Sequence, residues 1–549
     1  MLDLESLFTD PTARREREAL FARWRREGLH DDLTIGEALT RAGAADPDNG
    51  LFFHSIDSPG QISLRELDRE SRSVAGALAR RGIARGDVVA IQLPNRVETA
   101  VIYCALARLG AILVPIVHSY GPTETAWIVR ASGAGHFVCP DRWGGVDFLE
   151  RTDRMPEARA IVVGERAPPG TISWQELLED RDPAFSPPRI AATDPLLVVY
   201  TSGTTSEPKG VVHSHQTMLA ELRNMPHMPI SRRGSVCLQP WPAGHIAGLC
   251  AVFGPLVTGI RVILLDKWND EQATSLIGDH GVTSLAGTPF HITALLDRKE
   301  RGDARLDSIE EITCGGAGGP PSLIERCQAA GWRAMRCYGS SEHPTATSGA
   351  AGASVVDLST TDGAPCPHTE VRIAREDGSE APTGEPGEVW LRGPEQFLGY
   401  TDPAKNLDAF APGSWFRTGD IGVVDARGQL AITDRLKDII IRGGENFSSV
   451  EIEDFVLRHE NVAEVAAVGL PDPRYGERVC VFVVPAEGRE APTIDELAKL
   501  FAELGVARQK TPEKVIAVDE FPRTPAGKIK KHELRGRLAK ENTARLPQE

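Results

Sequence analysis

Residues 200–210 read YTSGTTSEPKG, and they follow an apolar run, PLLVVY (195–200), that is typical of a buried strand. Backbone N–H groups of a Gly/Ser/Thr loop at the start of a helix form a nest for anions, and Lys209 adds a positive charge that suits phosphate. We therefore predict a strand, a polyphosphate-binding loop and then a helix over about 216–225. The loop is not the common P-loop, because Gly210 stands where that motif has Ser or Thr. The alternative interpretation is a solvated Ser/Thr turn.

The rest of the first 360 residues alternates between strand and helix signals. Apolar runs predict strands at 88–93, 111–116, 261–266 and 282–289, and helices are predicted after a capping box at 63–66 and over about 96–109. This alternation predicts an α/β fold in which helices cover parallel sheets.

The texture changes beyond about residue 363, where short segments separated by Gly and Pro indicate antiparallel hairpins. From residue 435 onward a smaller unit is indicated, with a helix at 450–459, two apolar strands and a helix at 493–504. A segment of about 110 residues is long enough for a core of its own. We predict two domains, residues 1–434 and residues 435–549.

Composition excludes several classes of protein. A net charge of −16 over 549 residues disfavours a nucleic-acid or anionic-membrane surface. The nine cysteines form no CxxC pair, which predicts a reducing, cytoplasmic compartment rather than a disulfide framework or zinc ribbon. No secretory signal is recognised at the N-terminus. The longest apolar stretch, 100–117, contains Arg108 and Gly110, so we interpret it as a buried helix running into a strand and not as a membrane span.

The loop at 200–210 closely resembles the signature loop of the adenylate-forming superfamily, which includes acyl-CoA synthetases, luciferases and the adenylation domains of peptide synthetases. Four further segments resemble the family's motifs in the right order: CYGSSEH (337–343), WFRTGD (415–420), DRLKDIIIRGGENFSSVEIE (434–453) and PRTPAGKIKK (522–531). Two residues depart from the family pattern, since Ser206 replaces the usual Gly and Ser341 the usual Thr. The resemblance implies a large N-terminal domain with a small β-barrel-like subdomain and a small, mobile α+β C-terminal domain.

The resemblance also implies roles in ATP binding. The residues implied to wrap the β- and γ-phosphates are Thr201, Ser202, Gly203, Thr204, Thr205 and Lys209. Those implied to line the adenine side are Gly316, Ala317, Tyr338 and Gly339, and those implied to bind ribose or phosphate are Asp420 and Arg435. Ser341 is expected to contact the α-phosphate and Glu342 to bind Mg²⁺, because magnesium prefers carboxylate and phosphate oxygens.

The resemblance assigns catalysis of adenylation to Lys528, whose ammonium neutralises the substrate carboxylate and the α-phosphate as they approach. His245, in WPAGHIAG (241–248), is implied to line the acyl pocket. Lys437 is implied to be the hinge of the C-terminal domain, and Gly443 and Gly444 to line a pantetheine tunnel. His213 and His215 form an H-x-H without further metal ligands at suitable spacing, so we expect helix-start packing or solvent exposure.

The implied reaction joins a small-molecule carboxylic acid to CoA with ATP and Mg²⁺, through an acyl-adenylate. Apolar or small residues around 245–250, 289–294 and 314–318 favour a fatty or alicyclic acid. GSSEHPT (339–345) also resembles cyclohexanecarboxylate–CoA ligases and medium-chain acyl-CoA synthetases. The alternatives are an enzyme that loads a carrier protein, a luciferase-like oxygenase and a non-catalytic binding module. No nucleic-acid partner is expected, and the sequence leaves the oligomeric state open, with a homodimer as one option.

Overall fold

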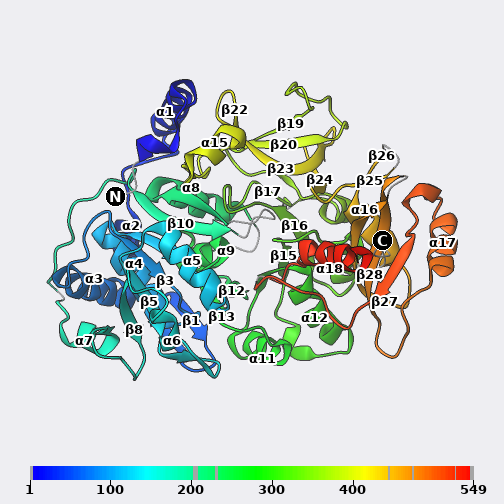
Figure 1. Cartoon of the computed structure of the whole chain (residues 1–549). Helices are drawn as coiled ribbons and strands as arrows, with labels where there is room; N and C mark the ends of the chain where they lie inside the picture. The colour runs from blue at the N-terminus through cyan, green and yellow to red at the C-terminus, as the bar shows by residue number, and fades with distance from the viewer. Residues whose placement is uncertain are drawn as a thin grey trace.

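The computed structural model describes residues 4–182, 184–201, 208–228, 233–350, 352–442, 445–472, 475–525 and 527–543 (Figure 1). Four larger sheets organise the described part of the chain, beside a two-stranded one made of β6 (Arg142–Trp143) and β7 (Val146–Asp147). In Figure 1 an eight-stranded sheet lies at the left, a nine-stranded sheet in the centre, an antiparallel sheet at the top and a C-terminal sheet at the right.

The eight-stranded sheet is parallel except at one edge. Its strands, in spatial order, are β21 (Gly399–Tyr400), β11 (Lys209–Ser214), β10 (Pro195–Thr201), β4 (Ile112–Pro115), β3 (Val88–Ile91), β5 (His136–Pro140), β8 (Arg159–Val163) and β9 (Ile172–Ser173). β11 pairs antiparallel with both β10 and β21. The predicted strand–helix–strand unit is confirmed, because α4 (Val97–Leu109) joins the parallel neighbours β3 and β4.

The nine-stranded sheet carries a run of parallel strands at its centre. Its strands, in spatial order, are β18 (Ala364–Pro365), β17 (Thr347–Ser348), β16 (Arg333–Tyr338), β15 (Glu311–Cys314), β14 (Ser284–Gly287), β12 (Val236–Gln239), β13 (Arg261–Leu265), β1 (Gly50–His54) and β2 (Gly60–Ser63). β16, β15, β14, β12 and β13 pair parallel with one another. Their carboxyl ends therefore meet at one edge of the sheet.

Helices cover both faces of these two sheets. One core is shared by both sheets and by α2 (Ile35–Ala45), α3 (Leu64–Arg80), α4, α8 (His215–Asn224), α9 (Ile246–Phe253) and α10 (Pro255–Thr258). The outer face of the nine-stranded sheet is covered by α11 (Asp270–His280), α12 (Pro289–Glu300), α13 (Pro321–Ala329) and α14 (Val355–Thr360). On the other sheet, α5 (Pro122–Ser132) and α6 (Leu149–Thr152) lie on the outer face. Alternate residues of β3 enter different cores, as the two-residue period of a strand requires.

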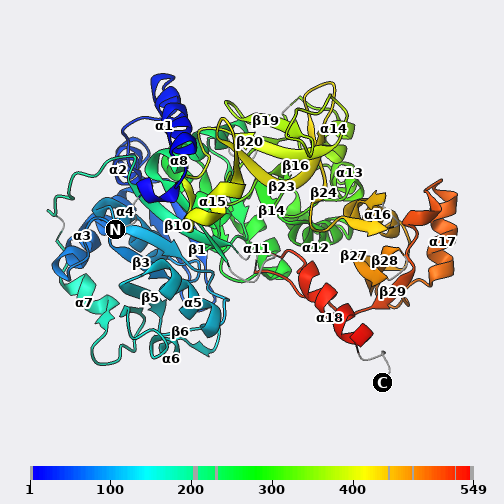
Figure 2. The same cartoon turned by 45° about the horizontal axis from the view of Figure 1, so that its top comes forward.

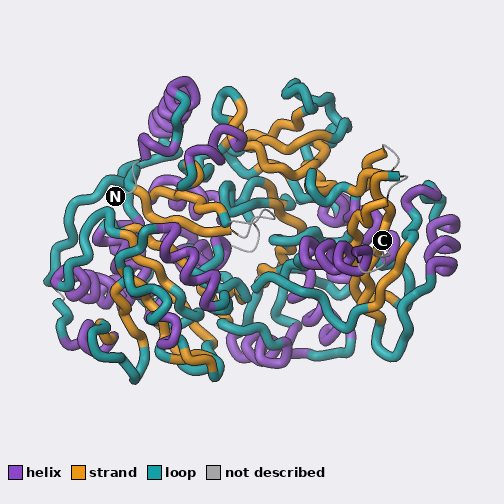
Figure 3. Tube along the Cα trace, viewed as in Figure 1, coloured by secondary structure: helices purple, strands orange, loops and turns teal. Residues whose placement is uncertain are grey.

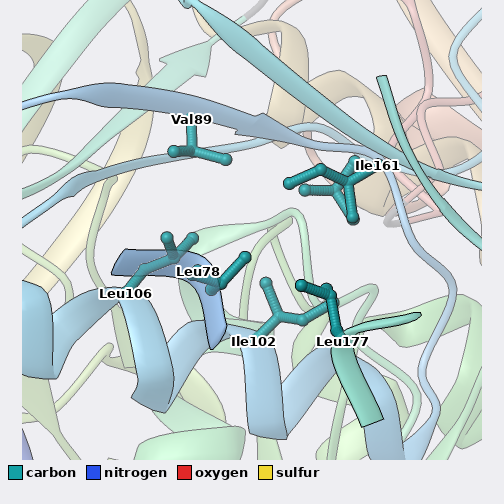
Figure 4. A pocket seen from close by; sticks show the side chains of 7 residues that line it. Leu78, Val89, Ile102, Leu106, Ile161 and Leu177 are labelled. Carbon is teal, nitrogen blue, oxygen red and sulfur yellow. The ribbon is translucent and has the colours of Figure 1, made fainter. Parts of the chain in front are cut away.

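Packing within the shared core is close. Figure 4 shows the space between α3, α4, α7 (Trp174–Glu179) and the strands β3, β5 and β8, which leaves no room for a water molecule. Its seven lining side chains are all aliphatic: Leu78, Val89, Ile102, Leu106, Val138, Ile161 and Leu177. This space is part of the core and not a ligand site.

The antiparallel sheet confirms the change of texture predicted after residue 363. Its strands are β19 (Glu370–Ala374), β20 (Gly387–Arg392), β22 (Phe410–Ala411), β23 (Trp415–Val424) and β24 (Leu430–Arg435), with α15 (Pro403–Ala409) beside them. Figure 3 shows this part of the chain as mostly strand and loop. The small segment η1 (Leu4–Leu7) contacts α15, and α1 (Pro11–Arg26) follows it.

The C-terminal sheet has its own hydrophobic cores. It contains β25 (Ile440–Arg442), β26 (Glu445–Phe447), β27 (Val462–Asp472), β28 (Gly476–Pro485) and β29 (Lys514–Ala517). α16 (Ser449–Val456) and α17 (Ile494–Glu503) pack on one face, and α18 (Lys531–Thr543) packs on the other. The predicted domain boundary at residues 434/435 coincides with the end of β24, and the division into domains stays a prediction. Over the residues described, the chain has no helix that is long and apolar enough to cross a membrane.

One predicted connection is wrong. The loop at 202–208 does not lead directly into a helix, because the strand β11 comes between the loop and α8. Its GVVHS sequence begins with a small residue and continues with two β-branched residues, which favour an extended chain beside PLLVVY. The loop therefore joins two antiparallel strands, and the helix N-terminus invoked above does not contribute to it.

A buried asparagine joins the two large sheets. Asn95 follows β3 and donates through Nδ2 to the carbonyl oxygens of Trp241 (2.9 Å) and Leu265 (2.7 Å), which follow or end strands of the other sheet. Its Oδ1 accepts a hydrogen bond from the amide of Ala243 at 2.7 Å. Asn95 thus holds the carboxyl-terminal edges of the two sheets together.

Replacing Asn95 with alanine leaves three buried backbone groups without their partner. We expect Asn95→Ala to lower the free energy of unfolding by about 3 kcal/mol, at one to two kcal/mol for each unpaired group. Urea unfolding followed by tryptophan fluorescence measures this. The matched control is Gln175→Ala, which removes an exposed amide on α7, and an equal effect of both substitutions would contradict the bridging role.

Candidate active site

The candidate site lies at the carboxyl-terminal edge of the nine-stranded sheet. β16 ends at Tyr338, and β15 leads into the glycine run 315–319. β14 leads into Thr288, and β12 is followed by Trp241. Parallel α/β sheets bind ligands at this edge because their strand ends and loops converge there.

Three predicted nucleotide-binding residues lie together. The hydroxyl of Tyr338 donates to Oδ2 of Asp420 at 2.6 Å, and Nε of Arg435 lies 2.9 Å from Oδ1 of the same carboxylate. Asp420 and Arg435 face each other on the neighbouring strands β23 and β24. Burial, followed by the charge of Asp420, raises the pKa of Tyr338, so the phenol stays protonated and donates. The carboxylate is therefore held in one orientation from both sides.

A tight turn presents Ser341 and Glu342. The hydroxyl oxygen of Ser340 accepts hydrogen bonds from the amides of Glu342 (3.2 Å) and His343 (3.3 Å). Gly339 begins the turn, and a Cβ there would lie 1.9 Å from the carbonyl oxygen of Pro344. Only glycine fits this close approach.

His213, on β11, holds the same turn through a hydrogen bond to its backbone. Its Nε2 donates to the carbonyl oxygen of Ser341 at 2.8 Å, and burial lowers its pKa to about 4, so the ring is neutral. His215 is also buried, and its Nδ1 accepts from the amide of Ile35 at 3.2 Å. The expectation of packing is confirmed for both, and the expectation of solvent exposure is wrong. Sequence analysis missed the contact with Ser341, because that residue lies far away in the chain.

Glu342 is held by a segment that the motifs did not indicate. The hydroxyl of Tyr400 donates to Oε1 of Glu342 at 2.7 Å, and the amide of Phe397 donates to its carbonyl oxygen at 2.8 Å. Nζ of Lys209 lies 4.9 Å from the centre of the Tyr400 ring. Tyr400 thus joins the predicted magnesium ligand to the predicted phosphate lysine. Its only signal in the sequence is an aromatic residue after glycine in FLGY.

A polar cavity of about 290 Å³ adjoins Lys209. Its lining residues are Lys209, Glu388, Tyr400, Lys405, Asp408, Ala409, Arg417, Thr418 and Gly419. Thr201 faces Lys209 as the last pair of the strands β10 and β11. Ser202, Gly203, Thr204 and Thr205 lie outside the described residues, as do Gly443 and Gly444 of the predicted tunnel.

Lys528 comes close to this group from the C-terminal part of the chain. Its amide donates to Oγ1 of Thr524 at 3.1 Å, and a Cβ on the neighbouring Gly527 would lie 3.0 Å from Oγ1 of Thr288. Burial, reinforced by the positive charge of Arg435, lowers the pKa of Lys528 to about 7, while Asp420 opposes the shift. The ammonium therefore lies within electrostatic reach of the residues that the motifs assign to the nucleotide.

His245 and several aromatic rings form a second group near Lys528. The His245 ring stacks on Trp241 with centroids 5.9 Å apart, and its Nδ1 accepts from the amide of Ala247 at the start of α9. Burial, with a contribution from Lys528, lowers the pKa of His245 to about 4. His291 lies edge-on to both Trp241 and Trp268. This wall is aromatic and uncharged at neutral pH.

The glycine run closes over this wall. Gly316 has φ +74°, and a Cβ there would lie 3.0 Å from the Trp241 ring. Ala317 follows it, partly exposed. Of the residues expected to form the acyl pocket, Leu249 is fully buried in the shared core. Phe290 lies edge-on to His291 with ring centroids 5.4 Å apart and under the guanidinium of Arg523.

Lys437 is exposed in the link between β24 and β25. Hydrogen bonds join the two sides of this link, because the carboxylate of Asp434 accepts from the amide and hydroxyl of Ser449, and Ser448 donates to the carbonyl oxygen of Thr433 at 2.6 Å. Asp438 also pairs with Arg535. These contacts hold the C-terminal sheet in its present orientation, and the hinge role of Lys437 stays a prediction.

Comparison with known proteins identifies the family. A family model described as AMP-binding enzyme matches residues 39–401, and one described as AMP-binding enzyme C-terminal domain matches residues 451–528. The medium-chain fatty-acid–CoA ligase of Escherichia coli K12 is 31% identical over 531 residues, which cover 94% of this chain and 92% of that protein. The indoleacetate–CoA ligase of Aromatoleum aromaticum is 31% identical over 503 residues, which cover 89% and 97%.

The same conclusion follows from solved structures. ATP-bound MatB from Rhodopseudomonas palustris superimposes with a TM-score of 0.82 and 27% identity, over 92% of this chain and 99% of that chain. The chain belongs to the AMP-binding enzyme family. The predicted α/β fold and the resemblance to the adenylate-forming superfamily are both confirmed.

The lowered pKa of Lys528 predicts proton uptake on nucleotide binding. At pH 8 a lysine with a pKa of about 7 is about one tenth protonated, and the phosphates of a bound nucleotide raise its pKa again. At pH 8 we expect the protein to take up close to one proton when it binds a non-hydrolysable ATP analogue. Calorimetry in buffers of different ionisation enthalpy measures this, and Lys528→Met should abolish the uptake. Equal uptake by both proteins would show that another group titrates.

Proposed function

We propose that the chain is an ATP-dependent, AMP-forming ligase that joins an apolar carboxylic acid to the thiol of coenzyme A. One observation carries the proposal: Gly527 packs against Thr288 at the edge of the nine-stranded sheet, and the charge of the adjoining Lys528 interacts with Asp420 and Arg435 and also with His245. This is where a cation is needed if a carboxylate is to attack a nucleotide phosphate. The two relatives described above are named as acid–CoA ligases, and this chain matches almost their whole length, which supports the same reaction.

In the first half-reaction, a carboxylate oxygen of the acid attacks the α-phosphorus of ATP, and the bond to the β-phosphate oxygen breaks. The products are the acyl-adenylate and pyrophosphate. Lys528 neutralises the two anions as they approach, and Lys209 stabilises the charge on the leaving pyrophosphate. Asp420, held by Tyr338 and Arg435, accepts hydrogen bonds from the ribose hydroxyls.

In the second half-reaction, the CoA thiolate attacks the acyl carbonyl and AMP leaves, while the thiol proton passes to solvent. Lys528 would obstruct the thiol in its present position. We infer that residues 435–549 rotate about Lys437, which separates Ser449 from Asp434 and brings Gly443 and Gly444 to the site.

Glu342 is the residue proposed to bind Mg²⁺. Of the described residues, no group of three or more His, Cys, Asp or Glu is arranged to hold a metal ion. Magnesium usually keeps several waters and binds through one or two carboxylates and the substrate phosphates, so a single carboxylate suits it. Tyr400 occupies Oε1 of Glu342 and orients the carboxylate, which leaves Oε2 for the ion. The ion, when bound, screens the charge of the phosphates. The fit is that of a magnesium ion carried by the nucleotide.

The proposed substrate is a medium-chain fatty acid or an alicyclic or aryl acid. Burial holds His245 and His291 neutral, with pKa values of about 4 and about 3, and the other wall residues are Trp241 and Trp268. Such a wall favours an aliphatic chain or a ring, and an amino acid would bury its ammonium without a partner.

The function is tested by pyrophosphate and AMP release from ATP and Mg²⁺ with a panel of acids, each with and without CoA. The panel runs from hexanoate through cyclohexanecarboxylate, benzoate and indoleacetate to dodecanoate, with alanine as the amino-acid control. We expect CoA-dependent AMP release with at least one apolar acid and none with alanine. Adenylate formation that CoA does not accelerate would point to a carrier protein as acceptor, and light emission with a luciferin to an oxygenase.

Lys528 separates the two half-reactions. We expect Lys528→Ala to slow acyl-adenylate formation by about 10³-fold, as for loss of an oriented transition-state charge, and to leave the conversion of supplied acyl-adenylate to thioester within a few-fold of wild type. Single-turnover assays of each half measure this. Lys530→Ala, which removes a neighbouring lysine that pairs with Glu533, is the matched control. Equal loss of both halves in Lys528→Ala would remove the assigned role.

A further inference from the structure

The segment before the family-matched region packs on the antiparallel sheet. Figure 2 shows α1 and the residues before it on the same side of the molecule as α15. Nδ2 of the Asn406 side chain donates to the carbonyl oxygen of Leu7 at 2.7 Å, and the backbone amide of Gly413 donates to Oε2 of Glu16 at 2.6 Å. Arg23 pairs with Glu370 at 3.0 Å. The partners in these contacts are separated by 347 to 399 residues of sequence.

Arg17 lies at the centre of this contact and is only 5% exposed. Its Nη2 donates to the carbonyl oxygens of Phe397 (2.7 Å) and Leu398 (3.0 Å). Its guanidinium carbon lies 4.4 Å from the ring centre of Phe410 and 4.8 Å from that of Phe8. No carboxylate in the described part of the chain forms an ion pair with it, and burial lowers its pKa to about 9. Carbonyl dipoles and aromatic faces therefore stabilise this charge.

Burying a charged side chain without a carboxylate partner costs free energy that an apolar side chain of the same volume would not cost. Apolar residues of similar volume often replace buried charged groups without loss of stability. Arginine supplies what an apolar side chain cannot, namely donors that fix two neighbouring carbonyl groups in one geometry. The position of the segment 397–398 is what these donors determine.

That segment leads directly to the candidate ATP site. The backbone amide of Phe397 donates to the carbonyl oxygen of Glu342 at 2.8 Å, and that of Leu398 donates to the carbonyl oxygen of Val212 in β11 at 2.7 Å. Two residues further on, Tyr400 holds the carboxylate of Glu342 and lies beside Lys209. Both the backbone and the side chain of Glu342 are thus anchored to the segment that Arg17 holds.

We propose that Arg17 is a positioning residue for the magnesium–ATP site, acting through the segment Phe397–Tyr400 on Glu342 and Lys209. The inference rests on the proposed roles of those two residues. Arg17 touches no substrate, and its loss frees the carbonyl oxygens of Phe397 and Leu398 from their donor. The segment then shifts, and the orientation of the Glu342 carboxylate is lost. The half-reaction that converts acyl-adenylate to thioester uses neither Glu342 nor Lys209, so it is not affected.

The test compares Arg17→Met, which keeps the length and packing of the side chain, with Arg14→Met on the exposed face of the same helix. The activation constant for Mg²⁺ and the KM for ATP are measured in acid-dependent ATP–pyrophosphate exchange. We expect Arg17→Met to raise the Mg²⁺ activation constant by about tenfold, as for loss of a residue that orients a metal ligand. Arg14→Met should stay within about twofold, as for other exposed substitutions. Thioester formation from supplied acyl-adenylate should be retained by both variants.

A merely structural role of Arg17 predicts a different pattern. It would lower both half-reactions together through the amount of folded protein, and Mg²⁺ would not rescue activity. Arg17→Lys, which keeps the charge between the rings and one donor, should recover most of the Mg²⁺ affinity. If Arg17→Met does not fold, Arg17→Lys and Tyr400→Phe are compared instead. We expect both to weaken Mg²⁺ activation, Tyr400→Phe more strongly than Arg17→Lys. An unchanged Mg²⁺ requirement in Arg17→Met, or in Tyr400→Phe where Arg17→Met does not fold, overturns the inference.

Two further measurements locate a failure. Glu342→Gln tests the proposed role of Glu342 itself, so a normal Mg²⁺ requirement in that variant removes the proposed site and with it the ground for the inference. A raised requirement in Glu342→Gln together with a normal one in Arg17→Met overturns the inference alone. In the double variant Arg17→Met/Tyr400→Phe we expect a loss no greater than that of the worse single variant, because both act on the same carboxylate, and additive losses would contradict the proposed route.

Discussion

The carboxylate of Asp420 is the point on which the candidate site depends. It accepts from Tyr338 at the end of the nine-stranded sheet and pairs with Arg435 at the end of the antiparallel sheet. It also opposes the shift that burial and Arg435 impose on Lys528. Three parts of the chain, each with its own core, are thus joined by one buried anion. A neutral side chain at this place would leave the phenol of Tyr338 and the guanidinium of Arg435 without their shared acceptor.

Charge is distributed unevenly across the site. The side assigned to the nucleotide is polar and contains Lys209, Arg417 and Arg435, whereas the wall near His245 is aromatic and neutral. The charge of Lys528 interacts with residues on both sides, and its lowered pKa reflects burial next to other cations. A polyanionic nucleotide relieves that repulsion. The burial beside other cations that destabilises the Lys528 ammonium in the free enzyme therefore favours uptake of a proton together with ATP. Because Lys528 belongs to the C-terminal part of the chain, this uptake couples nucleotide binding to the position of the C-terminal sheet.

Local patterns predicted much of the fold. The helix over 97–109 and the strands beside it follow from apolar periodicity, and the capping boxes at Ser63 and Thr493 mark the starts of α3 and α17. The strand β11 was missed because the loop before it was interpreted by analogy with phosphate loops that lead into helices. The short VVHS run could have indicated the strand, since β-branched residues favour extended backbone. For His213, the pattern indicated packing, but nothing local to the residue indicates a bond to Ser341.

The sequence by itself determined the family and the chemistry of individual residues: the phosphate loop, the turn around Glu342, the aspartate of WFRTGD and the lysine near the C-terminus. Each of these is a local string whose residue types suit the group that it is proposed to bind. Only the tertiary structure decided which residues hold them. Tyr400 and Arg17 carry no motif of their own, and they meet Glu342 because β21 pairs with β11 and α1 packs on the antiparallel sheet. Contacts between segments hundreds of residues apart depend on sheet pairing and helix packing, which no local stretch of the chain encodes.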